Sequence, residues 1–169
     1  MTKPLVDDKQ FRKACGKFST GVAVATVRQN EHTAVGLTVS SFTSVSLDPP
    51  LVLFCVHRQS RVLPEFRKCQ RFGINVLSAD QLELSTRFAS RETQNFHCLN
   101  DQPGSVCVPI LPGALAVLEC KLENVISCGD HDILVGEVVA LSVKDGDPLI
   151  RYNSSYCMLE KTTTGCSTS

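Results

Sequence analysis

The sequence predicts a mainly β protein, built as a closed antiparallel barrel with helices over its ends. Many short apolar runs are separated by turn-forming residues, which is typical of an all-β barrel. Only three segments carry apolar residues at helical spacing. No repeat, linker or change in composition divides the 169 residues. We therefore expect a single domain over 1–169, with its core at about 8–159 and a flexible polar tail at 160–169.

The first predicted helix is capped by Asp7 or Asp8 and ends before Thr20. Its apolar face recurs at helical spacing and consists of Phe11, Cys15 and Phe18. A strand over 22–27 and a returning strand over 34–40 then flank a polar loop, so this part of the chain is expected to form a hairpin.

The segment 36–50 is the most informative part of the chain. Its strand-like alternation slips at Ser40-Ser41, and the segment stops at a double proline, Pro49-Pro50. The slip predicts a bend or bulge that leaves backbone N–H groups unpaired. Unpaired amides among hydroxyl groups suit an anionic or heteroaromatic ligand. An ordinary Ser/Thr-rich strand on the barrel rim would show the same pattern.

Two strands and two helices are predicted in the middle of the chain. The continuous apolar run 51–56 indicates a strand buried on both faces. Residues 61–68 are expected to form a short helix with Pro64 in its first turn, where a missing N–H costs little. Another strand covers 72–77, and a capping box at 78–81 opens the third helix. That helix is expected to carry Leu82, Ser85, Phe88 and Ala89 on one side.

The C-terminal half is expected to be a loop followed by antiparallel strands. Residues 91–112 read as a long surface loop with room for one short strand. A half-buried strand follows, whose apolar positions are Leu118, Cys120 and Leu122. After a turn at 128–130, its hairpin partner continues with Ile133, Val135, Val139, Leu141 and Val143 on one phase. A turn at 145–148 precedes short strands at 149–152 and 156–159.

Composition argues against several classes of partner. The 17 basic and 17 acidic residues give a net charge of zero, so nucleic acid is not expected as a partner. No segment is long and apolar enough to span a bilayer, and the start of the chain carries no apolar signal region. We therefore expect a cytoplasmic protein without membrane contact.

Cysteine usage points to thiols rather than to metal ligands. Nine cysteines are present and no two form a CxxC motif, so neither a zinc ribbon nor a thioredoxin-like pair is expected. Several are interpreted as small core hydrophobes, with Cys120 the clearest example. The sequence also lacks the glycine fingerprint of a Rossmann fold, the nucleophile elbow of hydrolases, the zinc protease motif and the P-loop.

The order of motifs resembles the flavin reductase-like family of FMN-binding split barrels over roughly residues 8–159. The resemblance rests on the motifs at 18–22, 36–52, 60–61, 72–77, 87–90 and 129–131, and on Tyr152 and Tyr156. It implies a six-stranded antiparallel Greek-key split barrel that forms a homodimer. It also implies binding of FMN or FAD, reduction of that flavin by NADH or NADPH, and often delivery of reduced flavin to a separate monooxygenase component.

The resemblance assigns candidate flavin residues position by position. The segment along the flavin ring and ribityl chain consists of Thr38, Val39, Ser40 and Ser41. The strand end and loop around the phosphate contribute Phe54, Cys55, Val56, Ser60 and Arg61. Arg87 and Phe88 match a region that reaches the phosphate or the adenylate. The alternative for Arg61 is a solvated charge at a helix start, and Phe88 falls on the apolar face of its helix, which favours a core residue.

The candidate nicotinamide residues are His131, Tyr152 and Tyr156. His131 closes a Gly-Asp-His turn, and the resemblance gives it the catalytic place near the flavin and the nicotinamide. A histidine that only satisfies the turn is the alternative. Tyr152 and Tyr156 match aromatic positions near the nicotinamide.

The leading hypothesis is an NAD(P)H:flavin oxidoreductase that supplies reduced flavin to a partner monooxygenase. Hydride transfer between two cofactors needs orientation rather than a protein nucleophile, which agrees with the missing catalytic motifs. A flavin-binding electron carrier or sensor without reductase turnover is the alternative. A thiol-rich, metal-responsive protein is a third possibility. The sequence leaves open the choice between FMN and FAD and between NADH and NADPH.

Overall fold

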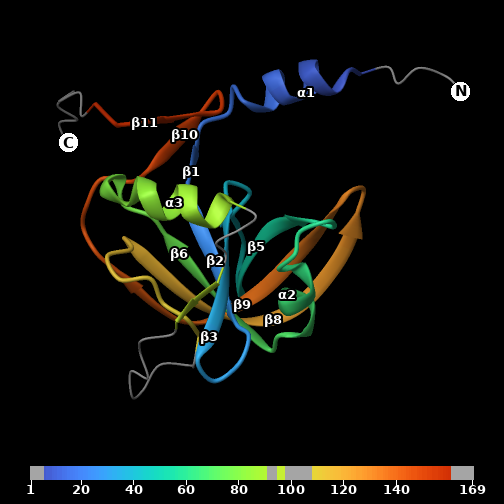
Figure 1. Ribbon diagram of the computed structural model, residues 1–169, viewed down its shortest axis with the longest axis vertical. Coiled ribbons are helices and arrows are strands. Elements are labelled where there is room, and N and C mark those ends of the chain that lie inside the picture. The colour runs from blue at the N-terminus through green and yellow to red at the C-terminus, as the bar shows by residue number, and fades with distance from the viewer. Residues whose placement is uncertain (1–5, 91–94, 98–107, 161–169) are drawn as a thin grey trace, which may run out of the picture.

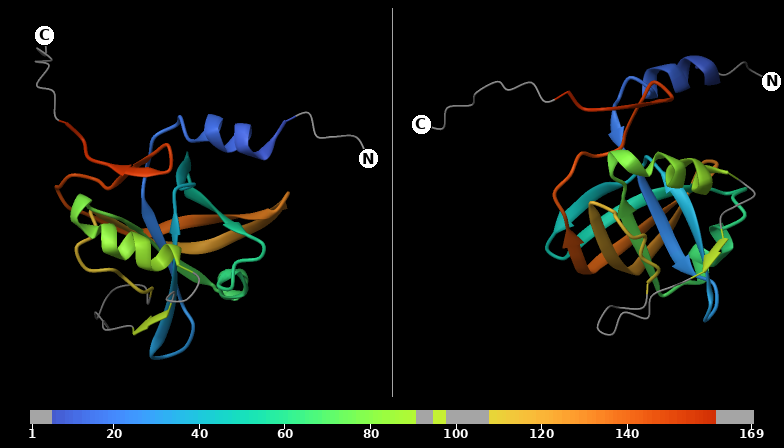
Figure 2. Two further views of the ribbon diagram at one scale, coloured as in Figure 1. Left: turned by 45° about the horizontal axis from the view of Figure 1, so that its top comes forward. Right: turned by 60° about the vertical axis from the view of Figure 1, so that its left-hand side comes forward.

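The computed structural model describes residues 6–90, 95–97 and 108–160. Eight antiparallel strands form one curved sheet in the order β4-β5-β9-β8-β6-β2-β3-β7 (Figures 1 and 2). These strands are β2 Ala23–Arg28, β3 Thr33–Val39, β4 Thr43–Leu47, β5 Pro50–His57, β6 Arg71–Val76, β7 Asn95–His97, β8 Ala116–Cys128 and β9 His131–Val143. A second sheet has the order β1-β10-β11, with β1 Thr20–Gly21, β10 Ile150–Tyr152 and β11 Ser155–Cys157. The mainly β antiparallel fold class is thus confirmed.

The helical elements lie outside this sheet. They are α1 Asp8–Cys15, α2 Leu63–Lys68, the 3₁₀ turn η1 Ala79–Gln81 and α3 Leu82–Ala89. Figures 1 and 2 show α3 across one side of the curved sheet, while α1 and the β10–β11 hairpin stand together at its top. None of the described helices is long and apolar enough to cross a membrane.

One continuous segment joins β4, at one end of the strand order, to β3, the last strand but one at the other end. β3 pairs with β2 as far as Val39, and β4 pairs with β5 from Thr43 onwards. The link at 40–42 lies where the sequence predicts a bend, so that prediction is confirmed. The sequence analysis does not anticipate β4, because this strand is mostly exposed and its register shifts between Ser44 and Ser46, which removes the alternation of a half-buried strand.

The main core fills the inside of the curved sheet. Phe54 is fully buried and packs edge-on against Phe66 and Phe72, at ring-centroid distances of 5.5 and 5.3 Å. The prediction that 51–56 is buried on both faces is wrong, since only alternate residues point inward. Its inward residues are Val52, Phe54 and Val56, and its outward residues Leu51, Leu53 and Cys55 remain half-buried. The run is continuous in the sequence because both faces are apolar, although one lies nearer to solvent.

A second apolar cluster lies under α3. It consists of Val22, Val24, Leu77, Phe88, Leu111 and Leu149. The predicted capping box is confirmed: the Ser78 N–H donates to the Gln81 side chain at 3.1 Å, and the Ser78 side chain caps the same turn. Since α3 is fixed at its start and buried along one face, it holds the strands that lead into 40–42 in place.

Helix α1 behaves differently from the other helices. The Asp7 side chain accepts a hydrogen bond from the Lys9 N–H, as the predicted cap requires. No residue of this helix is buried, and Phe11 is 61% exposed. The helix ends at Cys15, so Phe18, which the predicted apolar face includes, lies beyond it and is 78% exposed. The apolar face predicted from sequence therefore has no cover within the described chain.

The observed bounds of three other predicted segments differ from the expected ones. Helix α2 begins at Leu63 rather than at residue 61, with Val62 as its N-cap. The long loop contains the short strand β7, and residues 98–107 of it lie outside the described residues, as do 161–169 of the predicted tail. The two predicted terminal strands are β10 and β11, each three residues long.

Candidate functional site

A pocket of about 470 Å³ opens beside the link between β3 and β4. Its lining residues are Phe18, Ser19, Thr20, Gly21, Ser40, Ser41, Phe42 and Thr43. Two segments far apart in sequence therefore form its walls, and both carry hydroxyl side chains and an aromatic ring. Within the described part of the chain, the backbone N–H groups of Ser40, Ser41 and Phe42 donate no hydrogen bond. The pocket thus offers unpaired amides, as the slip in the sequence predicts.

The four residues predicted along the flavin ring have different environments. Ser40 is exposed and lines the pocket, and the Ser41 hydroxyl accepts a hydrogen bond from the Cys55 N–H at 2.9 Å. The Thr38 hydroxyl donates to the Ser85 carbonyl at 2.7 Å, which ties β3 to α3. Val39 is 5% exposed and belongs to the main core. Ser40 and Ser41 therefore line the pocket, while Thr38 and Val39 fix the strand behind them.

The donor set of this pocket fits an isoalloxazine ring. A flavin ring has carbonyl oxygens and ring nitrogens along one edge, which accept hydrogen bonds, and two flat apolar faces. Unpaired amides and serine hydroxyls provide donors, and Phe18 and Phe42 provide aromatic surface. The volume also falls in the range typical of small-molecule sites, about 300–1,000 Å³.

Two of the three β5 residues predicted to surround the phosphate are buried in the core, and the third is half-buried. The side chains of Phe54 and Val56 are fully buried, so a ligand could reach only their backbone. Cys55 is half-buried and faces the link at 40–42 through its contact with Ser41. Cys55 and Ser41 thus bring the β5 end to the wall of the pocket.

The turn after β5 carries the predicted anion-binding residues. The Ser60 N–H donates to the His57 carbonyl at 2.8 Å, so this amide closes the turn rather than pointing outward. Arg61 is exposed and makes no hydrogen bond or ion pair with any described residue. Its guanidinium is therefore available to an external anion.

Arg87 and Phe88 lie away from this pocket. The Arg87 side chain donates to the Asn95 carbonyl at 3.1 Å and lies 5.4 Å from the Phe88 ring. Asn95 pairs with Val35, four residues before the end of β3. Phe88 is 1% exposed and packs edge-on against Phe96. Of the two interpretations of Phe88, its burial agrees with a core residue.

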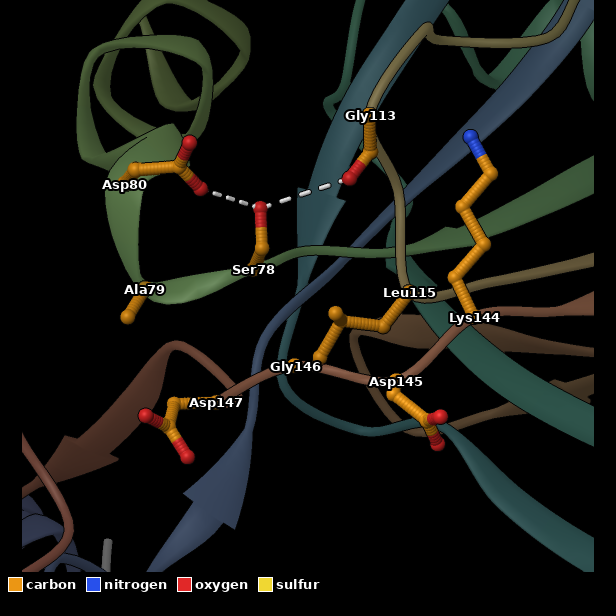
Figure 3. Close-up of a pocket in the computed structure, with 9 residues that line it drawn as sticks. All are labelled: Ser78, Ala79, Asp80, Gly113, Leu115, Lys144, Asp145, Gly146 and Asp147. Carbon is orange, nitrogen blue, oxygen red and sulfur yellow. Dashed lines mark hydrogen bonds between the residues drawn. The ribbon is translucent and has the colours of Figure 1, made fainter.

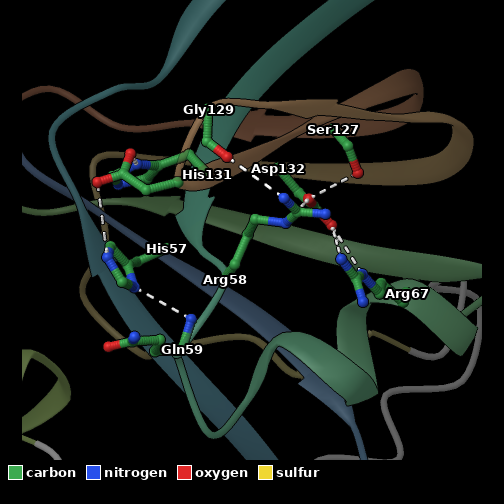
Figure 4. Close-up of polar contacts among 9 residues, drawn as sticks. His57, Arg58, Gln59, Arg67, Ser127, Gly129, His131 and Asp132 are labelled. Carbon is green, nitrogen blue, oxygen red and sulfur yellow. Dashed lines mark hydrogen bonds and ion pairs between the residues drawn. The ribbon is translucent and has the colours of Figure 1, made fainter. Parts of the chain in front are cut away.

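His131 begins β9 and lies directly opposite His57, the last residue of β5. The two rings meet edge-to-face at 5.0 Å (Figure 4), and His131 Nδ1 is 2.7 Å from the Asp130 carboxylate. His57 follows Cys55 by two residues, about 7 Å along the strand. His131 is therefore at the same end of β5 as the Ser41 wall of the pocket.

The hydrogen bond with His131 lowers the pKa of the exposed Asp130 carboxyl below its ordinary value, and the neighbouring charges of His131 and His57 act in the same direction. Asp130 is therefore ionised throughout the neutral pH range.

Tyr152 lies next to the strand pair that carries Thr20 and Gly21 of the pocket wall. Thr20 and Gly21 pair with Arg151 and Ile150 of β10, and Tyr152 is the next residue. Tyr152 lies under the Lys17 ammonium at 5.6 Å and is partly exposed. Neither His131 nor Tyr152 is among the residues that line the pocket, but Tyr152 follows the strand that pairs with Thr20 and Gly21.

Tyr156 is engaged within the protein. Its hydroxyl lies 2.8 Å from the hydroxyl of the buried Ser85, and the Arg151 guanidinium lies 5.4 Å from its ring. Because the Ser85 carbonyl accepts the hydrogen bond from Thr38, the hairpin β10–β11 and the strand β3 are joined through α3. Tyr156 thereby fixes the hairpin relative to the pocket.

Sequence analysis misses the buried carboxylate at the centre of this region, Asp132. Arg67 donates from Nε at 2.7 Å and from Nη2 at 2.6 Å, and the Ser127 hydroxyl donates at 3.1 Å (Figure 4). Arg58 Nε lies 3.7 Å away. An aspartate next to the apolar residues of β9 is the signal that the sequence offers.

The Asp132 cluster holds two turns together. Arg58 donates from its backbone N–H to the Asp130 carbonyl at 2.9 Å and from its side chain to the Gly129 carbonyl at 3.3 Å. Burial by itself raises the pKa of Asp132, but hydrogen bonds from Arg67 and Ser127 and the charges of both arginines outweigh it. The pKa of Asp132 therefore lies below its ordinary value. Through Arg58, the turn that carries Arg61 is tied to the turn that carries His131.

Replacement of Asp132 by asparagine is expected to lower the thermal unfolding midpoint at pH 7 by several degrees. The neutral amide leaves the two arginines without their counter-charge. Folding lowers the pKa of this carboxyl below its value in the unfolded chain, about 3.9. The carboxylate therefore stabilises the fold fully when the pH is above that unfolded pKa, and this contribution is lost as the pH falls through the folded pKa.

Thermal melts of both proteins between pH 7 and pH 3 should therefore converge in acid. The exposed Asp145 provides the matched control, as Asp145→Asn should leave the melting curve unchanged at every pH. Parallel curves for Asp132→Asn and the parent protein would contradict the assignment.

A second hollow, of about 380 Å³, lies at the far end of β9 and contains none of the predicted site residues (Figure 3). It is lined by Ser78, Ala79, Asp80, Gly113, Leu115, Lys144, Asp145, Gly146 and Asp147. The Ser78 hydroxyl is shared between Asp80 and the Gly113 carbonyl, which stabilises the start of η1.

The described cysteines are free thiols. They are Cys15, Cys55, Cys69, Cys120, Cys128 and Cys157. Burial raises the pKa of Cys120 to about 12 and that of Cys69 to about 11, so these two are unreactive core groups at neutral pH. No group of three potential metal ligands occurs among the described residues.

Comparisons with known proteins agree with this architecture. A family model described as "Flavin reductase like domain" matches residues 15–160. The FMN reductase (NADH) SmoA of Agrobacterium fabrum (strain C58) is 46% identical over 143 residues, which cover 85% of this chain and 81% of SmoA. The flavin-dependent monooxygenase reductase subunit HsaB of Mycobacterium tuberculosis is 36% identical over 159 residues, covering 92% of this chain and 84% of HsaB.

A solved structure shows the same fold. The NADH:FAD oxidoreductase SgcE6 of Streptomyces globisporus C-1027, in complex with NAD and FAD fragments, superposes with a TM-score of 0.84 at 32% sequence identity. The match covers 95% of this chain and 99% of SgcE6. Since the family match extends over most of the chain and the relatives are aligned over nearly their full length, the chain belongs to the flavin reductase like domain family.

Proposed function

We propose that this protein is an NAD(P)H:flavin oxidoreductase that reduces FMN or FAD and supplies the reduced flavin to a partner monooxygenase. The observation that carries the proposal is the family match over residues 15–160 together with a pocket whose unpaired amides fit a flavin ring. Relatives named as an NADH-dependent FMN reductase and as a monooxygenase reductase subunit support NADH as the donor and a separate oxygenase as the acceptor of reduced flavin.

In this proposal the flavin ring occupies the pocket between the two hydroxyl-rich walls. Ser40, Ser41 and Phe42 present amides and hydroxyls to the ring edge, and Arg61 holds the phosphate. When bound, flavin supplies the hydride-accepting chemistry. The chain itself has to hold two flat rings in contact and in the correct orientation, which requires no protein nucleophile.

A homodimer forms part of the same proposal. It is supported by apolar side chains that remain exposed in one chain, among them Phe11, Phe18, Leu141 and Val143. A cytoplasmic location is supported by the free thiols of the described cysteines, which persist in a reducing compartment.

The decisive experiment measures oxidation of NADH and of NADPH at 340 nm, a general property of reduced nicotinamides, with FMN, FAD or riboflavin added in turn. Turnover that requires added flavin supports the proposal, and the preferred pair identifies the substrates. Flavin binding without turnover would replace it with a carrier or sensor. Absence of both binding and turnover would overturn it.

Replacement of Arg61 by alanine is expected to weaken binding of FMN by about tenfold, because one charged hydrogen bond to the phosphate is worth roughly 1.5 kcal/mol or more. Binding of riboflavin, which has no phosphate, should not change. Equilibrium titration of both flavins by fluorescence tests this prediction. Equal affinities for FMN in the variant and the parent protein would remove Arg61 from the phosphate site.

Replacement of His131 by alanine is expected to slow flavin reduction about tenfold and to leave flavin affinity nearly unchanged. The imidazole stands behind the pocket wall and orients the nicotinamide rather than the flavin, and one hydrogen bond of about 1.4 kcal/mol corresponds to tenfold in rate. Stopped-flow mixing of NADH with the flavin-loaded protein measures the rate. A variant that reduces flavin at the parent rate would exclude His131 from the site.

A further inference from the structure

Three titratable side chains meet where β5 ends against the β8–β9 turn (Figure 4). His131 Nδ1 lies 2.7 Å from one oxygen of Asp130, and His57 Nε2 lies 3.8 Å from the other oxygen. The two imidazole rings are in edge-to-face contact at an interplanar angle of 82°. One carboxylate therefore faces two imidazoles, each through a different oxygen.

The partners of the ring nitrogens decide where each proton resides. An ionised carboxylate only accepts hydrogen bonds, so Nδ1 of His131 must carry a proton in order to bond with Asp130. The Gln59 N–H donates to Nδ1 of His57 at 3.0 Å, so that nitrogen must be bare. The proton of neutral His57 therefore resides on Nε2, which points to Asp130. The two histidines are held in opposite tautomers.

The other charged groups nearby contact residues other than the Asp130 carboxylate. The guanidinium groups of Arg58 and Arg67 are directed to Asp132, the residue that follows His131 in β9. The Arg58 backbone N–H donates to the Asp130 carbonyl and thereby fixes the position of that residue. His131 Nε2 has no hydrogen-bond partner within the described part of the chain, and the side chain is 43% exposed.

We propose that Asp130 and His57 are positioning residues that lock His131 in the tautomer with its proton on Nδ1. In the neutral ring the outward Nε2 is then a hydrogen-bond acceptor. An acceptor at this place selects a ligand with an N–H donor, such as the carboxamide NH₂ of a nicotinamide, and disfavours a carboxylate there. The lock is a property of the chain alone, whereas the choice of ligand rests on the proposed function.

The lock is tested by long-range ¹H–¹⁵N NMR of the imidazoles, in which the nitrogen shifts distinguish the two neutral tautomers. Spectra are recorded over a range of alkaline pH, and the neutral forms of the two rings are compared between proteins. In the parent protein His131 should carry its proton on Nδ1 and His57 on Nε2. Asp130→Ala should move His131 toward the opposite tautomer. Asp130→Asn should retain it, because the amide oxygen still accepts from Nδ1, although its NH₂ cannot accept from His57.

Turnover provides the second readout. Asp130→Ala should lower kcat/KM for NADH about tenfold without changing flavin affinity, and Asp130→Asn should stay within about threefold of the parent protein. The preference for NADH over its nicotinic acid analogue should shrink in Asp130→Ala. Asp145→Ala, which removes a carboxylate elsewhere on the surface, is the matched control and should change nothing.

The outcomes test the tautomer lock, its role in ligand choice and the proposed function separately. His131 with its proton on Nε2 in the parent protein, or an unchanged His131 tautomer in Asp130→Ala, would overturn the lock. A confirmed lock with normal turnover in Asp130→Ala would overturn the role of the lock in ligand choice. If the parent protein oxidises no reduced nicotinamide, the proposed function fails, while the nitrogen shifts still decide the tautomer.

Discussion

Replacement of Gly21 by tryptophan is expected to weaken flavin binding by at least about 100-fold. Gly21 lines the proposed flavin pocket, and a Cβ added there would meet no atom within 4 Å. An indole in a pocket of about 470 Å³ occupies the space that a flavin ring requires. Because the new side chain enters open space rather than packed core, the fold should tolerate it.

Gly21→Ala is the matched control, as a single methyl group leaves the pocket largely open and flavin affinity should change less than about threefold. Circular dichroism and thermal melts of both variants verify the fold. Full-strength flavin binding by a folded Gly21→Trp protein would place the flavin elsewhere. This experiment therefore tests the pocket itself, whereas Arg61→Ala tests one end of the ligand.

Replacement of Phe54 by alanine is expected to destabilise the protein by about 3–5 kcal/mol, the cost typical of removing a buried aromatic ring. Phe54 is fully buried at the centre of the sheet and makes edge-on contacts with two further rings. The cavity left behind is lined by other large side chains of the same core and closes only in part. Chemical denaturation followed by fluorescence or circular dichroism measures the loss.

Leu47→Ala serves as the control, because Leu47 is 94% exposed and should contribute little to the folding free energy of one chain. The more conservative Phe54→Leu separates a core role from a cofactor role. It keeps most of the packing and should leave flavin affinity of the folded protein unchanged. A folded Phe54→Leu protein with impaired flavin binding would show that the ring does contact the cofactor.

The periodic parts of the chain could be predicted from the sequence. Alternation located the β8–β9 hairpin, and the capping box located the start of α3. The slip at Ser40-Ser41 marked the link whose amides face the pocket. These features are local, since each depends on residues a few positions apart. The exposed strand β4 has no such local pattern and was missed.

The environment of the candidate site residues could be predicted only in part, because it depends on contacts between residues far apart in the sequence. Ser40 and Ser41 line the pocket, and Arg61 and His131 are exposed or half-buried at turns elsewhere in the described chain. Phe88 matched a motif position, but packing places it in a core cluster. No sequence pattern marks His57 as the partner of His131, because the two residues are 74 positions apart and meet only through the pairing of β5 with β9.

The sequence by itself determined the fold class, the family and the segment that bends to expose its amides. Those properties follow from side-chain periodicity, turn chemistry and motif order, which are all encoded locally. The tertiary structure alone decided which face of β5 is core, that Asp132 is held between Arg67 and Ser127, and which nitrogen of His131 faces outward. Each of these depends on strand register and on contacts between distant residues, which fix burial and hydrogen-bond partners only after the chain has folded.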